Sequence, residues 1–359
     1  MTIVGDIAAA PVARLPVAPS LAPVRAWLWA TAALVFLMVV VGGATRLTES
    51  GLSITEWKLV AGVLPPLSDA SWQAEFDAYK QIPQYSQLFP TMSLSDFKFI
   101  FYWEWSHRLL GRLIGVVFAL PLAWFWLRGY LTNRMKWQFS ALLALGGLQG
   151  AVGWWMVKSG LAGRVEVAPE RLATHLLLAS ITFAALVWLA VGLRPKPREA
   201  ATSGQRRIVK VLLGLTLVQI GLGALVAGLR AGLTYNTWPL MDGRLVPPMA
   251  HLTALDPLWR NLFENVTAVQ FDHRMAAYVL LGLAIWHAVA VSGSTTTSVR
   301  GRARALAGLI VVQAGLGIAT LLMVLPEGRI PLAPALLHQA VAMAVLAMAT
   351  IHARRLAQR

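Results

Sequence analysis

The sequence predicts an all-α integral membrane protein with eight transmembrane helices, arranged as two parallel-repeat four-helix bundles. Hydrophobic residues make up 57% of the 359 residues and charged residues only 13%, with a mean hydropathy of +0.62. This composition does not fit a surface that faces water. Apolar runs of about twenty residues, the length that crosses roughly 30 Å of hydrocarbon, recur eight times. The second half of the chain also repeats motifs of the first half. A soluble enzyme is therefore excluded.

The spans are taken in order from these apolar runs. The predicted spans are 27–45, 107–127, 138–157, 172–193, 208–229, 273–292, 304–325 and 334–353. Residues 1–26, rich in Ala, Pro and Val, are expected to form a disordered cytoplasmic tail. The first apolar run could alternatively be a cleaved signal peptide. A cytoplasmic linker, 196–207, divides the N-terminal half, 27–195, from the C-terminal half, 208–359.

Glycine-rich faces along several spans predict close packing between helices. The glycines concerned are Gly111, Gly115, Gly146, Gly150, Gly153, Gly221 and Gly317.

The distribution of charge predicts the orientation in the membrane. One side, made of both termini and every second connecting segment, carries 17 Lys and Arg residues against two acids, Asp6 and Glu199. The opposite side carries 14 basic and 14 acidic residues, so the net charge of +15 lies on one side. By the positive-inside rule both termini are cytoplasmic, and we expect a multi-pass protein of the cell inner membrane. The pI near 11.0 thus indicates topology and lipid contact and not nucleic-acid binding.

Three pairs of segments carry the internal repeat. They are EWSHR (104–108) with QFDHR (270–274), LQGAVG (148–153) with VQAGLG (312–317), and LATHLLLA (172–179) with ALLHQAVA (335–342). The loop GLSITEW (51–57) likewise matches GLTYNTW (232–238). Each half has an even number of spans, so the two halves have the same orientation and the repeat is parallel.

The first external segment is longer than its counterpart in the second half. Ser68 is a candidate helix cap, and Trp72, Phe76 and Tyr79 follow at helical spacing. This pattern predicts an amphipathic helix on the outer surface. A plain connecting loop is the alternative.

Four of the seven histidines, His107, His175, His273 and His338, occupy repeat-related positions at the outer ends of spans that all run inward. The four imidazoles are therefore expected at one depth, near the periplasmic side. Two imidazoles from parallel helices can hold a planar metal macrocycle from both faces, as in haem with two axial histidines. A hydrogen-bonded core histidine is the alternative for each. Zinc is less favoured, because two histidines per half leave a tetrahedral site short of ligands and the chain has no cysteine.

An arginine directly follows the first histidine of each half: Arg108 follows His107 and Arg274 follows His273. An arginine inside the membrane edge needs an anion, and haem propionates suit a bidentate guanidinium. Arg108 and Arg274 are therefore candidate cofactor-binding residues. Three further arginines could serve likewise or extend to the lipid headgroups: Arg46, Arg112 and Arg230.

The halves differ beside the first histidine. Glu104 precedes His107 by three residues, on the same helical face, and the corresponding residue of the second half is Gln270. The acid makes Glu104 a candidate for proton transfer, and an ion pair with Arg108 or Arg112 is the alternative. The asymmetry suggests a reactive first half and an electron-transfer second half.

Through EWSHR, QFDHR, GLSITEW and the later histidines His175 and His338, the chain resembles the haem A synthase family over essentially its whole length. The long first loop and the absence of cysteine resemble its proteobacterial and mitochondrial-type branch, without the cysteine pair of some bacterial members. The resemblance implies an oxidoreductase that converts the C8 methyl of haem O to a formyl group through a hydroxymethyl intermediate. The product, haem A, serves cytochrome c oxidase.

The resemblance also implies roles for individual residues. His273 and His338 would ligate the iron of a haem b cofactor, and His107 and His175 would ligate the iron of the substrate, haem O. Glu104 would be catalytic together with His107 and His175. Haem O synthase, a farnesyltransferase, is the expected protein partner, and the electron donor stays unassigned.

A quinol-linked di-haem cytochrome b is the competing interpretation. His287 follows His273, and His352 follows His338, by 14 residues, which is nearly four helical turns. A second haem between His287 and His352 would allow electron transfer across the membrane. The first half has no histidine at the matching positions, which argues against this interpretation. A haem transporter is a third possibility, but the histidines cluster at the outer edge and not at the midplane.

Overall fold

The structure is a computed structural model, and it describes residues 20–58, 60–194, 199, 201–294 and 296–357. Eight helices in this part of the chain are long and apolar enough to cross a membrane. They are α1 (Ala22–Leu47), α4 (Leu94–Leu127), α5 (Asn133–Lys158), α6 (Pro169–Gly192), α7 (Ser203–Gly228), α10 (Val266–Ala290), α11 (Thr297–Leu322) and α13 (Leu332–Ala357). The described residues contain no strand beyond one isolated bridge. The all-α, eight-span prediction is confirmed.

Each predicted span lies within one of these helices, to within three residues at its C-terminal end. The largest difference is at α4, which begins thirteen residues before the predicted span. A reciprocal cap starts it there: Ser93 Oγ accepts from the Asp96 N–H at 3.2 Å, and Asp96 Oδ2 accepts from the Ser93 N–H at 3.2 Å. His107 consequently lies well inside its helix and not at the helix end.

The predicted boundaries of the tail and linker differ from the structure where it can be compared. Helix α1 begins at Ala22, with Pro23 in its first turn, a position that suits proline because the missing N–H has no partner there. Residues 1–19 of the predicted tail lie outside the described residues. So do residues 196–198 and 200 of the predicted 196–207 linker, whose last five residues belong to α7.

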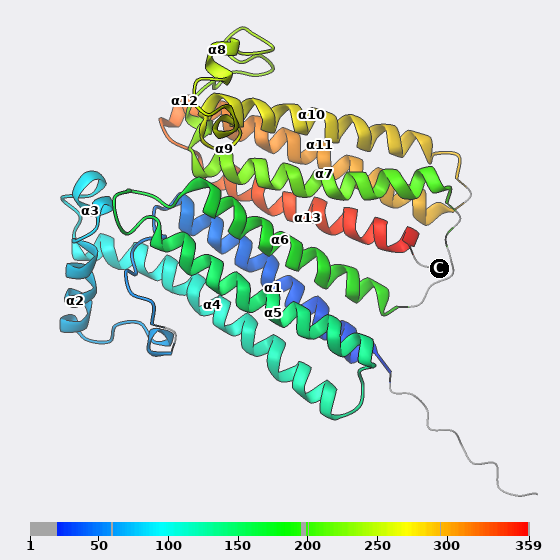
Figure 1. The fold of residues 1–359 in the computed structure, drawn as a ribbon, viewed down its shortest axis with the longest axis horizontal. Helices are drawn as coiled ribbons and strands as arrows, with labels where there is room; N and C mark the ends of the chain where they lie inside the picture. Colours follow the sequence, from blue (N-terminus) through cyan, green and yellow to red (C-terminus); the bar gives the residue numbers. More distant parts are fainter. Residues whose placement is uncertain (1–19, 59, 195–198, 200, 295, 358–359) are drawn as a thin grey trace, which may run out of the picture.

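The long helices run side by side in a single bundle (Figure 1). In the first half α1 and α5 each pack against both α4 and α6, and in the second half α7 and α11 each pack against both α10 and α13. The halves meet where α6 packs on α7 and α13, and where α1 packs on α13. Helices α4 and α6 thus lie across from each other, as do α10 and α13. This arrangement agrees with a parallel duplication, which stays an interpretation.

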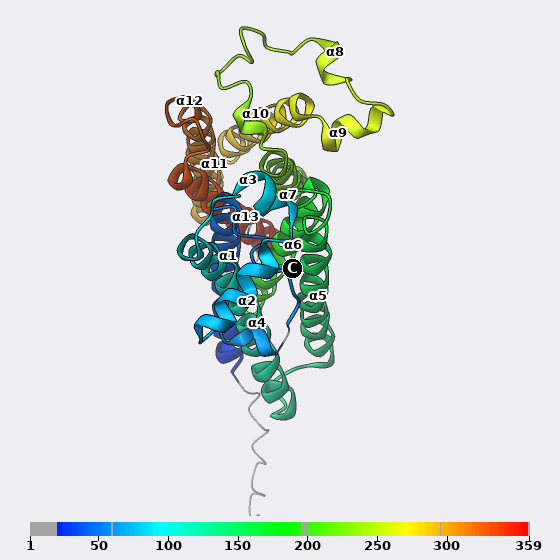
Figure 2. The same ribbon diagram turned by 90° about the vertical axis from the view of Figure 1, so that its left-hand side faces the viewer.

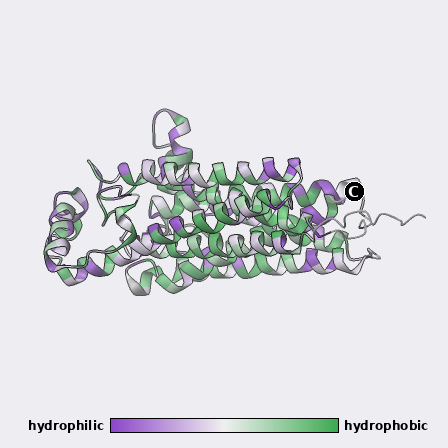
Figure 3. Cartoon of the chain, turned by 90° about the horizontal axis from the view of Figure 1, so that it is seen from below, coloured by the Kyte–Doolittle hydropathy of each residue, from purple (hydrophilic) through white to green (hydrophobic). Residues whose placement is uncertain are grey.

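Apolar residues dominate the middle of the bundle and polar residues its ends (Figure 3). Large apolar side chains also face outward, for example Leu120, 66% exposed, and Val279, 53% exposed. Such a surface suits lipid tails and not water. Helix α1 begins and α13 ends at the same end of the bundle (Figure 1).

The short helices gather at the opposite end (Figures 1 and 2). They are α2 (Asp69–Tyr79), α3 (Pro83–Leu88), α8 (Met249–Leu252), α9 (Asn261–Glu264), α12 (Val324–Glu327) and the single turns η1 (Ala61–Val63), η2 (Ala231–Leu233) and η3 (Leu258–Arg260). Figure 2 views the molecule from this end and shows α8 beyond α10, on the side away from α4, with α9 beside α10.

The predicted amphipathic helix is confirmed as α2, capped by Ser68. Its apolar face packs against the early part of α4 and not on the lipid surface: Trp72 lies 5.0 Å from Phe101, and Phe76 stacks at 5.0 Å on Phe97, between ring centroids. Tyr79 is fully buried beside them. The extension of α4 beyond the other spans therefore provides the surface that α2 covers.

Candidate functional site

The repeat-related histidines lie on helices that face each other across each half. His273 of α10 and His338 of α13 have ring centroids 6.5 Å apart and ring planes at 73°. His107 of α4 and His175 of α6 lie close enough to interact electrostatically. All four side chains are half-buried. The structure therefore brings the histidines together in the two pairs that the repeat predicts.

Each of these imidazoles lies against a glycine of a neighbouring helix. A Cβ atom at Gly42 would lie 3.0 Å from His107, and one at Gly153 would lie 3.0 Å from His175. A Cβ at Gly223 would lie 3.1 Å from His273, and one at Gly317 would lie 2.8 Å from His338. These distances are shorter than normal carbon contacts, so any side chain there would displace the ring. The predicted role of Gly153 and Gly317 in helix packing thus becomes a specific one: they make room for imidazoles.

Three of the histidines also contact a glutamine that precedes this glycine by four residues, one helical turn. The amide nitrogens of Gln149, Gln219 and Gln313 lie 3.1, 3.0 and 3.1 Å from the Nδ1 atoms of His175, His273 and His338, in that order. In each of the three glutamines Oε1 is buried and has no partner among the described residues. The motif Gln-x-x-x-Gly is therefore a shared setting for three of the imidazoles.

One ring nitrogen of His338 has a defined role in the structure. Its Nδ1 lies 3.0 Å from the carbonyl oxygen of Gln313, which can only accept, so Nδ1 carries the proton. The backbone carbonyl of His273 accepts a hydrogen bond from Gln219 Nε2 at 3.0 Å. A proton on Nδ1 leaves the lone pair of Nε2 for a metal, and such a backbone partner is typical of metal-ligating histidines.

The second-half pair fits the iron of a planar macrocycle. A metal–imidazole bond is about 2 Å long. Each ring centre lies about 1 Å beyond its nitrogen. Two imidazoles that bind one iron from opposite faces therefore have ring centroids roughly 6 Å apart. The 6.5 Å between His273 and His338 matches this separation.

Glu104 is buried, with 3% of its surface exposed, and it accepts four hydrogen bonds. Ser53 Oγ and the Ile54 N–H donate to Oε2, both at 2.8 Å. Arg108 donates to Oε1 from Nε at 3.1 Å and from Nη2 at 2.6 Å. The ion pair with Arg108 that the sequence left open is therefore present, and the carboxylate is also tied to the loop GLSITEW.

Gln270, the counterpart of Glu104, is buried and donates where Glu104 accepts. Its Nε2 donates to the carbonyl oxygens of Ala231 at 2.8 Å and Thr234 at 2.7 Å. The first-half loop presents an N–H and a hydroxyl to its acid, and the second-half loop presents carbonyls to its amide. Each loop thus presents the hydrogen-bonding groups that its own residue needs: donors to Glu104 and acceptors to Gln270.

Arg108 and Arg274, the two residues predicted to bind haem propionates, contact these same loops. Arg108 donates to the carbonyls of Ile54 at 2.7 Å and Glu56 at 3.1 Å. Arg274 donates to the carbonyls of Tyr235 at 2.6 Å and Thr237 at 2.9 Å, which are the corresponding loop positions. Each arginine therefore holds the loop above its histidine in place. Their role toward a propionate stays a prediction.

Arg46 and Arg230, weaker candidates for the same role, are paired with protein carboxylates. Arg46 contacts Glu166 at 2.6 Å and Glu49 at 3.5 Å. Arg230 contacts Glu49 at 2.6 Å and also Glu166. Burial raises the pKa of the Glu49 carboxyl above its ordinary value although Arg46 and Arg230 act in the opposite direction. This group of four residues links the end of α1 in the first half to the end of α7 in the second.

The distance between His287 and His352 does not suit a second haem. Both residues are fully buried, and their Nε2 atoms lie 3.0 Å apart, within hydrogen-bond distance. Two bonds of about 2 Å each to one metal need a larger separation. His352 also accepts a hydrogen bond from Arg302 Nε at 3.2 Å, and Arg302 forms an ion pair with Glu199. The di-haem interpretation is therefore not favoured.

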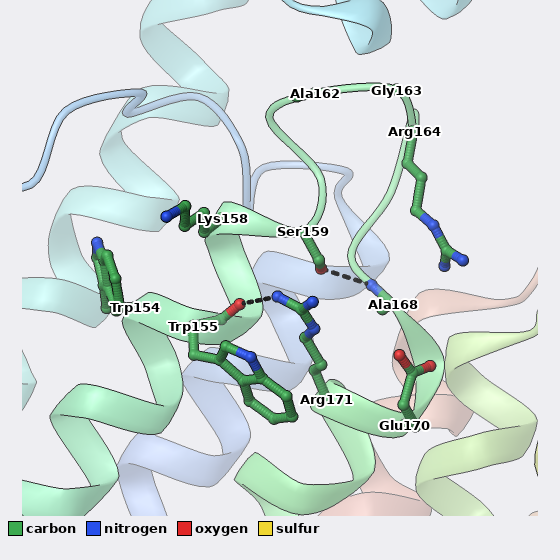
Figure 4. Close-up of a pocket in the computed structure, with 10 residues that line it drawn as sticks. All are labelled: Trp154, Trp155, Lys158, Ser159, Ala162, Gly163, Arg164, Ala168, Glu170 and Arg171. Atoms are coloured by element: carbon green, nitrogen blue, oxygen red, sulfur yellow. Dashed lines mark hydrogen bonds between the residues drawn. The ribbon is translucent and has the colours of Figure 1, made fainter.

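A pocket of about 600 Å³ lies at the ends of α5 and α6 (Figure 4). Arg171 donates to the Trp155 carbonyl at 2.7 Å and lies over the Trp155 ring at 4.5 Å from its centroid. Lys158 lies over Trp154 in a similar way, 5.1 Å from the centroid. Such paired cations and tryptophans are typical of a membrane–water interface. None of the four paired histidines lines this pocket.

Among the residues that the sequence singled out, the structure groups Glu104 with Arg108, and His273 with His338. Sequence reasoning missed Gln219 and the glycines Gly42 and Gly223. A signal was available, because VQIGLG around Gln219 repeats VQAGLG around Gln313 almost letter for letter.

The fold and the site define the class: a multi-pass helical membrane protein that presents imidazoles in opposed pairs from facing helices. The family model described as cytochrome oxidase assembly protein matches residues 25–350. The chain is 60% identical to the heme A synthase of Beijerinckia indica subsp. indica over 336 residues, covering 92% of each chain. It is 56% identical to the heme A synthase of Bradyrhizobium sp. strain ORS 278, covering 94% of this chain and 92% of the relative. The heme A synthase of Rhodopseudomonas palustris strain BisA53 is 55% identical, covering 93% and 91%. The chain belongs to the cytochrome oxidase assembly protein family.

Proposed function

We propose that this protein is a haem A synthase, an oxidoreductase that converts the C8 methyl of haem O to the formyl group of haem A through a hydroxymethyl intermediate. The opposed pair of His273 and His338, 6.5 Å between ring centroids, is the observation that carries the proposal. The names of relatives at 52–60% identity support it.

The second half would hold haem b as an electron carrier. His273 and His338 would hold its iron in this proposal, and the Nδ1–H of His338 donates to the Gln313 carbonyl on α11. A haem with two fixed imidazoles supplies one-electron transfer and leaves no position for oxygen. The chain would contribute the orientation of the two imidazole rings.

The first half would hold the substrate between His107 and His175. Glu104 lies one helical turn from His107, and four donated hydrogen bonds orient its carboxylate. Its oxygens would accept and return protons while the methyl group is oxidised to the alcohol and then to the hydrated aldehyde. Each of these two-electron oxidations also needs an oxidant and an oxygen atom supplied from outside this chain. Loss of water from the hydrate completes the product.

Arg108 and Arg274 would bind haem propionates through those guanidinium N–H groups that do not already donate to the loop carbonyls. A guanidinium has five such groups. The Nε–H of Arg274, for example, has no partner among the described residues. Both arginines would thereby join the loop, the histidine helix and the cofactor.

The charge distribution supports a place in the cell inner membrane with both termini cytoplasmic and the haem sites near the periplasmic side. Haem O synthase, a farnesyltransferase, would supply the lipophilic substrate, which can enter from the bilayer between helices. The sequence contains no motif that identifies the electron donor.

Extraction of porphyrins from cells that express this protein beside a haem O source tests the proposal. Haem A and its hydroxymethyl precursor are expected in the extract, and neither in cells without the protein. If a folded, haem-loaded protein yields neither porphyrin, the proposed function is wrong.

A further inference from the structure

Three of the four paired histidines have a glutamine partner, and His107 does not. Met38 of α1 is the counterpart of Gln219, at the offset of 181 residues that also relates Gly42 to Gly223 and the loop glycine Gly51 to Gly232. The glycine of the motif is therefore kept in α1, and the glutamine is replaced by methionine.

This replacement leaves the His107 ring with no hydrogen bond to any described residue. Its close neighbour on α1 is Gly42, at 3.0 Å from Nε2 for an added Cβ. The Met38 methyl lies against Gly111, one turn further along α4, where a Cβ would be 3.1 Å away. A thioether donates no hydrogen bond. Within the described part of the chain, the His107 ring is therefore restrained by van der Waals contact and not by a hydrogen bond.

The position of Gly111 is also distinct. It follows His107 by four residues, and the residues at that spacing after the other three histidines are all alanine: Ala179, Ala277 and Ala342. The small Gly111 accommodates the longer Met38 side chain. The two substitutions therefore belong to one local arrangement, found only at His107 among the four histidines.

A side chain that lies against a ligating imidazole fixes the orientation of the ring, and losing such an outer-shell partner typically lowers metal affinity 10–100-fold. His175 has such a partner in Gln149, whose amide nitrogen also donates to the His175 carbonyl at 3.0 Å. The first half thus offers one restrained imidazole and one unrestrained imidazole, and the second half offers two restrained ones.

We propose that His107 is the releasable ligand of the substrate haem and that Met38 and Gly111 make it so, while Gln149 keeps His175 as the permanent ligand. Gln149, Gln219 and Gln313 are then positioning residues. This inference rests on the proposed function and specifies which side of the substrate iron opens during exchange and turnover. By the same argument the second half, with a glutamine at both histidines, would retain its haem.

Carbon monoxide binding to the reduced protein tests the proposal, because carbon monoxide binds a haem iron only where an axial ligand gives way. The wild-type protein loaded with haem O is expected to bind it at the first-half haem alone. Met38→Gln should restrain His107 and lower the association rate about 10–100-fold. Met38→Leu, which keeps an apolar side chain, is the matched control and should keep the wild-type rate.

The reciprocal variant keeps the test decisive if Met38→Gln fails to fold. Gln219→Met removes the amide that lies against the His273 ring and should make the second-half haem reactive toward carbon monoxide. An unchanged rate in Met38→Gln, or an unreactive second haem in folded Gln219→Met, would overturn the inference. Porphyrin extraction from the same cells separates the two proposals. Formation of haem A together with unchanged rates of carbon monoxide association would refute only the releasable ligand. The absence of haem A from a haem-loaded protein would refute the proposed function itself.

Discussion

Arg108 and Glu104 form a buried ion pair one helical turn apart on α4, with 2.6 Å between Nη2 and Oε1. The same guanidinium holds the carbonyls of the GLSITEW loop, and the same carboxylate accepts from Ser53 and Ile54. A negatively charged acid is therefore built into the first half one turn from His107. The second half has the neutral Gln270 in its place.

Glu104→Gln is expected to abolish formation of both hydroxymethyl haem and haem A while leaving haem b bound. The amide keeps the shape of the carboxyl group but cannot take up a proton, and it places an NH2 group near donors of the loop. Porphyrin extraction and the haem b content of the purified protein measure the two effects. Normal turnover in this variant would remove Glu104 from the mechanism.

Gly317→Ala is expected to lower haem b content strongly. The added methyl would lie 2.8 Å from the His338 ring and push it from its position. Gly315→Ala is the matched control on the same helix, because a Cβ atom at Gly315 would have no neighbouring atom within 4 Å. Haem per protein and the low-spin haem spectrum compare the two variants. Equal haem loss in both would show that Gly317 has no special relation to His338.

His287→Leu is expected to leave the haem spectrum and the number of haems per protein unchanged. The Nε2 atom of His287 lies 3.0 Å from that of His352, too close for both to ligate one haem iron. Its loss leaves a buried ring nitrogen of His352 without its partner, which costs about 1–3 kcal/mol of stability. Thermal unfolding would show the loss, and disappearance of one haem would instead support the di-haem cytochrome.

The stability of the wild-type protein relative to Glu49→Gln is expected to rise as the pH falls from neutral toward 5. Burial raises the pKa of Glu49 in the folded state above its value of 4.5 in a free chain. Between these two pKa values the folded state binds more protons than the unfolded state, so its stability falls as pH increases. Unfolding temperatures of both proteins at two pH values measure the difference. A shift of opposite sign would show that Arg46 and Arg230 dominate over burial.

Much of the fold could be predicted because it depends on local properties of the chain. The number of spans follows from the length of apolar runs, and α2 follows from the Ser68 cap and the spacing of Trp72, Phe76 and Tyr79. The early start of α4 was missed, because residues 94–106 are less apolar than a membrane span and are stabilised by α2, which packs on them.

The sequence by itself determined the eight helices and the pairing of histidines between repeats, since both depend on spacing along the chain and on matches between distant segments. Tertiary structure alone decided what each polar side chain contacts. The loop donors at Glu104, the loop carbonyls at Gln270, the direct contact of His287 with His352, and the glutamine that His107 lacks all depend on which helices are neighbours and how each is rotated about its axis. Those relations join residues far apart in sequence, and a residue's own type does not specify them, because the same glutamine or histidine finds a partner on one helix face and none on another.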